Sequence, residues 1–222
     1  MTTVPTDTHE PGLGFPAVGE RLEEAGVWVE VYAQAELPTR SGDFHILVFR
    51  NSVDDHENVA LVRGSVRGAT HLPARLHSEC LTGDVLGSLR CDCRDQLEMA
   101  LGAIGRRERG VLLYLRQEGR GIGLGNKIRA YELQQNGLDT FEANEHLGFD
   151  ADLRDYRIAA LILRLLGVRS VDLVTNNPRK IFGLNAHGVQ VTQRLPAVTE
   201  QNPHNEGYLA TKAKNGHILP SV

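Results

Sequence analysis

The three cysteines of this chain carry the clearest chemical signal, because all of them fall close together. Cys80, Cys91 and Cys93 are the whole cysteine content of the 222 residues, and they follow a C-x10-C-x-C spacing. Three thiolates held near one another repel unless a positive charge lies between them, and zinc favours a tetrahedral shell of nitrogen and sulfur ligands. Three protein ligands leave a fourth position open, as in catalytic zinc sites, where the pKa of the bound water is lowered to roughly 7. The spacing therefore predicts a catalytic zinc site.

Other interpretations of the cysteines stay open at the level of sequence. Buried cysteine often serves as a small hydrophobic residue, although the neighbours here are polar and include Ser78, Glu79 and Arg94. A closed structural zinc site would need a fourth ligand, and His77 lies only three positions before Cys80. A lone histidine is more often satisfied by hydrogen bonds than bound to metal, so we expect His77 to lie outside the zinc shell.

The signature of the nucleobase deaminases does not fit. His77 and Glu79 match its H-x-E half, and its second half is P-C-x-x-C. Here the second half reads Arg90-Cys91-Asp92-Cys93, with neither the proline nor the two-residue gap. The spacing excludes deaminase chemistry of this type.

A basic, glycine-rich loop over residues 116–129 is the second candidate site. It carries four cations and one anion, with glycine at every second position from 119 to 125. Glycines let the backbone approach a ligand closely, while Arg120, Lys127 and Arg129 can neutralise phosphate oxygens. The loop matches neither G-x-x-x-x-G-K-[ST] nor G-x-G-x-x-G. A phosphate-binding loop and a solvated turn are therefore both compatible with it.

Two polar clusters further along the chain support a ligand site. They comprise Thr140, Glu142, Asn144, Asp152, Arg154 and Asp155, and then Thr175, Asn176, Asn177, Arg179 and Lys180. Asp152 and Arg154 lie at the start of a predicted helix, where an aspartate also serves well as a cap. Lys180 follows a predicted strand end and a proline, a position suited to meeting a phosphate.

The elements that position these residues differ between the two halves of the chain. Period-two alternation predicts antiparallel strands over residues 27–32, 44–48 and 59–62. The second half predicts helices over 92–107, 127–136, 152–166 and 180–185, and strands over 110–115 and 171–174. We therefore expect an α+β fold class: a mixed fold in which a β-rich N-terminal half packs with an α/β C-terminal half, as a single zinc-containing domain.

The distribution of proline, glycine and polar residues along the chain predicts its domain organisation. Residues 1–26, rich in proline and glycine, predict a mostly flexible arm with one helical turn around residues 20–24. Residues 27–195 are expected to form the catalytic domain, and the polar residues 196–222 an extended C-terminal segment.

Composition excludes several classes of protein. The chain is 41% hydrophobic, which allows a full core, and an odd number of cysteines argues against a secreted disulfide scaffold. A net charge of −4 argues against a bulk nucleic-acid partner. No run approaches 18 apolar residues and no signal peptide is recognisable, so we expect a cytoplasmic protein without a membrane partner.

Taken together, these motifs resemble GTP cyclohydrolase II, a zinc enzyme of riboflavin biosynthesis. The resemblance runs from about Leu37 to His217 and rests on several segments. These are Arg75–Asp84 (RLHSECLTGD), Ser88–Cys93 (SLRCDC), Arg116–Arg120 (RQEGR), Asn126–Tyr131 (NKIRAY), Thr175–Pro178 (TNNP) and Asn202–Leu209 (NPHNEGYL).

The resemblance implies a role for each matching residue. Cys80, Cys91 and Cys93 would be the zinc ligands. Asp152 would be the proton acceptor and Arg154 the nucleophile, with Tyr131 as a further active-site residue. The residues that would bind GTP are Arg75, Leu76, His77, Ser78, Glu79, Gln96, Glu118, Gly119, Arg120, Thr140, Thr175 and Lys180. Gln96 and Glu118 would read the guanine edge.

The family reaction converts GTP and water to formate, pyrophosphate and a 2,5-diamino-6-(ribosylamino)pyrimidinone 5′-phosphate, with Mg²⁺ on the triphosphate and a homodimeric enzyme. A guanidinium has a pKa above about 12 and no free lone pair, so we expect Arg154 to stabilise phosphoryl charge rather than attack phosphorus. Two rival hypotheses stay open: a non-catalytic zinc-stabilised nucleotide-binding module, and a specialised relative that gives a different ring-opened product in secondary metabolism.

Overall fold

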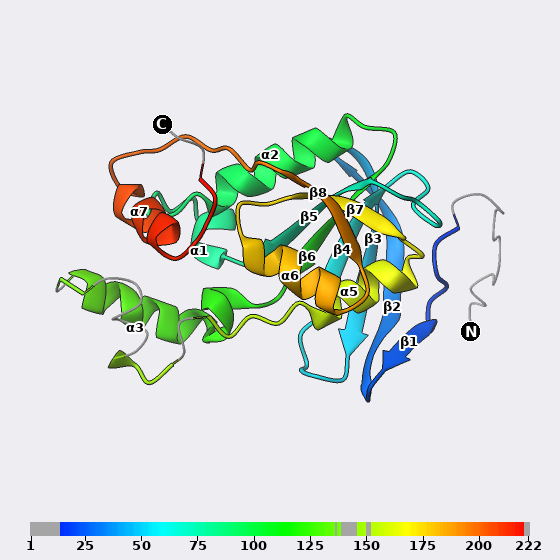
Figure 1. Cartoon of the computed structure of the whole chain (residues 1–222), viewed down its shortest axis with the longest axis horizontal. Coiled ribbons are helices and arrows are strands. Elements are labelled where there is room, and N and C mark those ends of the chain that lie inside the picture. Colours follow the sequence, from blue (N-terminus) through cyan, green and yellow to red (C-terminus); the bar gives the residue numbers. More distant parts are fainter. Residues whose placement is uncertain (1–13, 136, 139–145, 150–151, 220–222) are drawn as a thin grey trace, which may run out of the picture.

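One eight-stranded sheet organises the computed structural model, which describes residues 14–135, 137–138, 146–149 and 152–219. The strand order is β1-β2-β3-β4-β6-β5-β7-β8 (Figure 1). The strands are β1 (Arg21–Glu24), β2 (Val27–Thr39), β3 (Gly42–Asn51), β4 (Asn58–Arg63), β5 (Leu72–Ser78), β6 (Gly110–Leu115), β7 (Ser170–Val174) and β8 (Gln190–Leu195). Pairing is antiparallel from β1 to β6 and parallel from β6 to β8. The expected mixed α and β architecture is confirmed.

Helices lie on both faces and at one end of this sheet (Figure 1). They are α1 (Leu81–Asp84), α2 (Cys93–Gly105), the 3-10 turn η1 (Glu118–Gly121), α3 (Gly123–Gln135), α5 (Arg157–Leu165), α6 (Pro178–Ala186) and α7 (Glu206–Lys214). Successive side chains of β6 point to opposite faces of the sheet, and each face packs against its own helices. Val111 and Leu113 join the main core with α5, whereas Leu112 joins a smaller cluster with Ile104 of α2.

Helix α5 supplies the densest part of the main core. Residues 159–163 are fully buried, and Tyr156 and Leu166 at its two ends are nearly so. Such continuous burial fits a helix covered on most of its surface, and α5 lies within the range 152–166 expected to be helical. The expected helices at 92–107, 127–136 and 180–185 are confirmed as α2, α3 and α6, and the expected strands at 110–115 and 171–174 as β6 and β7.

Three expectations about local structure are wrong. Residues 21–24 form strand β1 on β2 rather than a helical turn, because Leu22 packs against the core while its neighbours face outward. The helix expected from Asp152 begins at Arg157, because the Asp152 carboxylate bonds Arg154 instead of capping α5. The C-terminal segment 196–222, expected to be extended, contains helix α7.

Strand β5 has no clear signature in the sequence. Its seven residues include Pro73, Arg75 and His77, which break the apolar pattern. Parallel pairing with β6 and β7 nevertheless buries Arg75 and His77 almost completely. Within the described part of the chain, no helix is long and apolar enough to cross a bilayer.

Gly105, the last residue of α2, provides a test of how tightly this helix packs against the β2–β3 turn. A Cβ atom there would lie 1.8 Å from the Ser41 carbonyl oxygen, so the backbone would have to shift. We expect Gly105→Ala to lower the free energy of unfolding by about 1–3 kcal/mol in urea denaturation.

Gly102→Ala in the same helix is the matched control. Its added Cβ would meet the flexible Arg106 side chain, with the nearest atom 3.2 Å away. The control should be neutral or up to about 1 kcal/mol more stable, because alanine is the better helix former. Equal stability of the two variants would contradict the packing described.

Candidate metal and nucleotide site

The expected site residues gather where three parallel strands end. Strand β5 leads into residues 79–84, its neighbour β6 into residues 116–121, and β7 into residues 175–180. Parallel strands bring their carboxyl ends to one edge of the sheet, and ligands in α/β folds bind outside that edge. Three motifs that are spread over about 100 residues of sequence thus become neighbours in space.

The three cysteines converge at this edge. Their Sγ atoms all lie within 4.8 Å of one another, and those of Cys80 and Cys91 are 3.7 Å apart. Cys80 directly precedes α1, Cys91 lies in the turn that follows it, and Cys93 begins α2. Among the residues that the structure describes, they are the one cluster of His, Cys, Asp or Glu side chains grouped closely enough to share a metal ion.

Packing and charge both fit a metal ion held by these thiols. A Cβ on Gly83 would lie 2.9 Å from the Cys91 sulfur and 3.2 Å from the Cys80 sulfur, so glycine keeps the space beside the sulfurs clear. Hydrogen bonds from Cys91 and Cys93 hold the pKa of Cys80 far below its usual value. The same contact with Cys80 raises the pKa of the Cys93 thiol. Three thiolates together need a cation, and an all-sulfur donor set suits zinc.

Asp84 organises the side of the site next to β5. Its carboxylate accepts hydrogen bonds from the Cys80 backbone N–H at 3.0 Å and from the Tyr114 hydroxyl at 2.8 Å. It also lies 3.0 Å from Nε2 of His77. Burial lowers the pKa of His77, so a neutral ring with its proton on Nε2 fits this contact. Nε2 is occupied by Asp84, and neither ring nitrogen of His77 belongs to the cluster of ligand atoms that the cysteines form, so the structure gives no support to His77 as a fourth zinc ligand.

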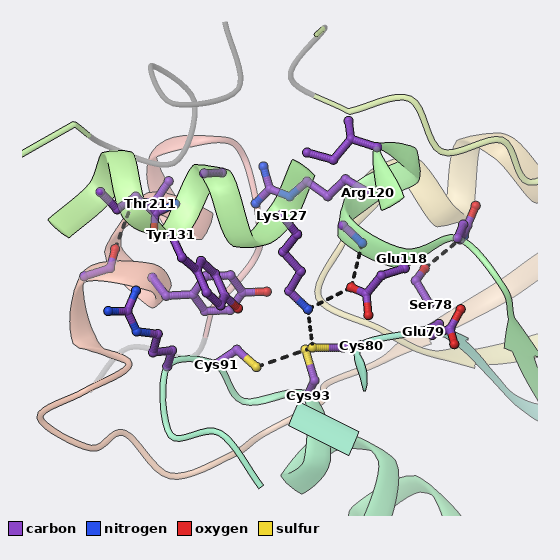
Figure 2. A pocket seen from close by; sticks show the side chains of 18 of the residues that line it. Ser78, Glu79, Cys80, Cys91, Cys93, Glu118, Arg120, Lys127, Tyr131 and Thr211 are labelled. Carbon is purple, nitrogen blue, oxygen red and sulfur yellow. Dashed lines mark hydrogen bonds and ion pairs between the residues drawn. The ribbon is translucent and has the colours of Figure 1, made fainter. Parts of the chain in front are cut away.

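The glycine-rich loop reaches the cysteines through Lys127. The Nζ atom of Lys127 donates to the Cys80 sulfur at 3.1 Å and to Oε1 of Glu118 at 2.7 Å (Figure 2). Oε2 of Glu118 accepts from the backbone N–H of Leu81 at 2.7 Å. The backbone of Arg120 adopts a φ of 62°, which is uncommon outside glycine and often marks functional loops. The loop is therefore built against the cysteines rather than left as a solvated turn.

A large cavity of about 650 Å³ opens beside the sulfurs. The expected site residues that line it are Ser78, Glu79, Cys80, Cys91, Cys93, Glu118, Gly119, Arg120, Tyr131 and Arg154 (Figure 2). Its volume falls within the range typical of small-molecule sites. The structure thus brings the glycine-rich loop, the cysteines and Arg154 to one cavity.

A second, smaller cavity of about 70 Å³ adjoins the first. Arg75, His77, Gln96, Thr175 and Lys180 line this cavity but not the larger one, and Ser78, Cys93 and Arg154 line both. Its volume is too small for a nucleoside, and its cationic lining suits an anionic group.

Lys180 is unusual among the residues of the small cavity because its ammonium group is almost completely buried. Its buried Nζ atom donates to the Leu76 carbonyl oxygen at 2.7 Å. Burial, together with the positive charges of Arg75 and Arg154, lowers the pKa of Lys180 well below its usual value. An anion bound here would offset this cost, because it would favour the charged form of the lysine.

Arg154 is fixed by a bidentate ion pair with Asp152. Nε and one terminal nitrogen of Arg154 donate to the two carboxylate oxygens at 2.7 and 2.6 Å. Burial alone would lower the pKa of Arg154, but the hydrogen bonds that Arg154 donates to Asp152 outweigh burial and raise the pKa above its usual value. For Asp152 the effects have the opposite signs. Burial alone would raise the pKa of its carboxyl group, but the hydrogen bonds and positive charge of Arg154 outweigh burial and lower that pKa. Arg154 therefore stays a cation.

Two expected site residues lie away from the cavities, and one lies outside the described residues. The Leu76 side chain is fully buried in the main core. Asp152 lines neither cavity and reaches the site through Arg154. Thr140 lies outside the described residues, as do Glu142 and Asn144.

Sequence reasoning missed the contribution of α7 and the residues before it. His204, Gly207, Tyr208 and Thr211 line the large cavity, and Tyr208 also lines the small one. The segment around Tyr208 was among the motifs of the resemblance, but it gave no sign of facing the cysteines. The spacing of Tyr208, Thr211 and Lys212, which share one helix face, is the signal that points to α7.

Comparisons with a family model and with individual proteins point to the same family. Residues 30–196 match the family model described as GTP cyclohydrolase II. The chain is 58% identical over 191 residues to GTP cyclohydrolase-2 of Azotobacter vinelandii, covering 86% of this chain and 92% of that protein. It is 56% identical over 188 residues to GTP cyclohydrolase-2 of Pectobacterium atrosepticum, covering 84% and 95%.

Longer relatives match over part of their length. The chain is 57% identical over 184 residues to riboflavin biosynthesis protein RibBA of Bacillus mycoides, covering 82% of this chain and 46% of that protein. It spans about half the length of this and other RibBA relatives.

The close approach of Gly83 to the sulfurs yields a prediction about metal binding. We expect Gly83→Ala to weaken zinc binding by about tenfold or more in a chelator competition, because the added methyl displaces the Cys91 sulfur. Gly102→Ala, whose methyl meets only the flexible Arg106 side chain, should bind zinc like the unmodified protein. Unchanged affinity in Gly83→Ala would show that the sulfurs do not form the metal site described.

Proposed function

The chain belongs to the GTP cyclohydrolase II family, and on that premise we propose that it hydrolyses GTP with opening of the guanine imidazole ring. The proposed products are formate, pyrophosphate and 2,5-diamino-6-(5-phosphoribosylamino)pyrimidin-4(3H)-one, at the first step of riboflavin biosynthesis. The observation that carries the proposal is the cluster of three thiols against a cavity of about 650 Å³. We also propose Mg²⁺ on the triphosphate and a homodimer, as the resemblance implies.

Zinc is the metal that we assign to Cys80, Cys91 and Cys93. When bound there, it would supply a Lewis acid and acidify a water molecule at the open coordination position. Gly83 keeps the space beside the sulfurs clear, and Asp84 orients the backbone of Cys80. The ammonium of Lys127 compensates part of the negative charge of the thiolates.

The two cavities suggest how GTP is placed. We assign the nucleoside to the large cavity, next to the sulfurs and Tyr131. We assign phosphate oxygens to the cations near the boundary between the cavities, with Arg154 lining both and Arg120 and Lys180 lining one each. In this placement Arg154 faces both the reacting base and the phosphates.

Gln96 and Glu118 were expected to read the guanine edge, and both are already hydrogen bonded. Gln96 accepts from Arg75 at 2.6 Å and donates to Asp92 at 2.6 Å. Glu118 accepts from Lys127, as described above. We propose that guanine contacts Glu118, which lines the large cavity, by exchanging one of those bonds, and that Glu118 also holds Lys127 beside Cys80. Gln96 lines only the small cavity, so in this placement it holds Arg75 beside the phosphates instead of reading the guanine edge.

Arg154 is assigned to electrostatic stabilisation of the phosphate that loses pyrophosphate. Its pKa, raised by Asp152, leaves no free lone pair on the guanidinium to attack phosphorus. A fixed cation positioned before the reaction stabilises developing charge without reorganisation. Asp152 holds the guanidinium in place through its bidentate contact.

A single quenched reaction tests these assignments. The protein loaded with zinc and incubated with GTP and Mg²⁺ should release formate, and mass spectrometry should show the diaminopyrimidinone phosphate. Cys91→Ser should lose both the zinc and ring opening, because two thiolates no longer complete the site. The peptide that contains Arg154 should carry no guanylyl group.

Other outcomes would redirect the assignment. Zinc and GTP binding without formate would favour a nucleotide-binding module, and a different ring-opened mass would favour a specialised relative. Full turnover by Cys91→Ser with normal zinc content would exclude the proposed ligands. A guanylylated Arg154 peptide would establish the covalent role instead of the electrostatic one.

A further inference from the structure

The segment 196–219 runs from the carboxyl end of β8, which lies beside the carboxyl end of β7, to the cysteines. It is tied at both ends to Asn176, which follows β7. The Asn176 side chain donates to the Ala197 carbonyl oxygen at 2.6 Å and accepts from the Ala197 N–H at 3.0 Å. The Ile218 N–H donates to the Asn176 carbonyl oxygen at 2.8 Å. Between these ties, α7 lies beside α1 at the end of the molecule that carries the site (Figure 1).

A buried ion pair joins α7 to the turn that carries two of the cysteines. Nζ of Lys212 lies 2.6 Å from Oδ1 of Asp92, and the two side chains are 10% and 2% exposed. The other carboxylate oxygen of Asp92 accepts from Gln96 at 2.6 Å and from Thr199 at 3.3 Å. Asp92 lies between Cys91 and Cys93 in the sequence, so the ion pair connects α7 directly to the turn that carries these two predicted metal ligands.

The same lysine lies over the ring of Tyr208. Its Nζ atom is 4.5 Å from the ring centroid, one helical turn away on α7. Tyr208 lines both cavities, and Thr211 lines the large one together with Tyr131 of α3 (Figure 2). Lys212, which itself lines the small cavity, thus connects Tyr208 and Thr211 in the wall of the large cavity, called the nucleotide cavity below, to the Asp92 carboxylate.

We propose that Lys212 is a positioning residue: its ion pair with Asp92 docks α7 against the cysteine turn, so that Tyr208 and Thr211 close the nucleotide cavity. The part of this inference that concerns GTP rests on the proposed function, whereas the docking of α7 does not. Removing one partner of a buried ion pair leaves the other charge uncompensated, so loss of Lys212 should release the helix.

Hydrogen exchange tests the docking without any substrate. In zinc-loaded Lys212→Met, the amides of α7 should exchange about tenfold faster or more, while those of α5 keep their protection. Lys212→Arg should restore slow exchange, because it keeps the charge. Ala213→Met, on an exposed position of the same helix, is the control and should behave like the unmodified protein.

Steady-state kinetics with GTP test the effect on the cavity. Lys212→Met should raise the KM for GTP about tenfold or more, with kcat within about threefold of the unmodified protein. Adding Asp92→Asn to Lys212→Met should raise KM no further, because the two residues act as one unit. A merely structural role would instead lower kcat in proportion to the folded fraction and leave KM unchanged.

The outcomes separate this inference from the proposed function. Unchanged exchange of α7 in Lys212→Met would overturn the docking, whatever the substrate proves to be. Faster exchange with an unchanged KM would overturn the role in the nucleotide cavity. If the unmodified protein turns over no GTP, the proposed function fails, and exchange alone decides whether Lys212 docks α7.

Discussion

The close approach of three cysteine sulfurs, which would repel one another as thiolates, is the constraint on which the rest of this site depends. Cys80, Cys91 and Cys93 converge to within 4.8 Å, a separation that three negative charges do not tolerate without a cation. Much of the surrounding structure supports this arrangement. Gly83 leaves space beside the sulfurs, and Lys127 brings a positive charge to 3.1 Å from Cys80. The packing around the three cysteines, as well as their ligand type, therefore fits a bound metal ion.

The sheet brings the remaining groups to that centre. Its parallel half aligns the carboxyl ends of β5, β6 and β7, and each of these ends leads into a polar motif. A cavity of about 650 Å³ adjoins a smaller one lined by cations, which suits a ligand with a large organic part and an anionic part. Membership in the GTP cyclohydrolase II family fits this division and gives the ligand that we propose.

Sequence reasoning found the features that depend on residue type and local spacing. The cysteine cluster follows from residue type and spacing, and the presence of helix α5 follows from apolar periodicity. Strand β5 was not predicted, because Arg75 and His77 are buried by pairing and hydrogen bonds that no local pattern reveals. The start of α5 was misplaced because Asp152 could cap a helix or hold Arg154, and tertiary context decides between the two. The role of Lys212 depends on a contact across 120 residues of sequence.

The coordination of zinc tests the central claim most directly. X-ray absorption at the zinc edge of the loaded protein should show three sulfur ligands at about 2.3 Å and one oxygen ligand at about 2.0–2.2 Å. That result would establish three cysteines and one open position, as the chemistry requires. A shell that contains imidazole nitrogen, or fewer than three sulfur ligands, would contradict the account.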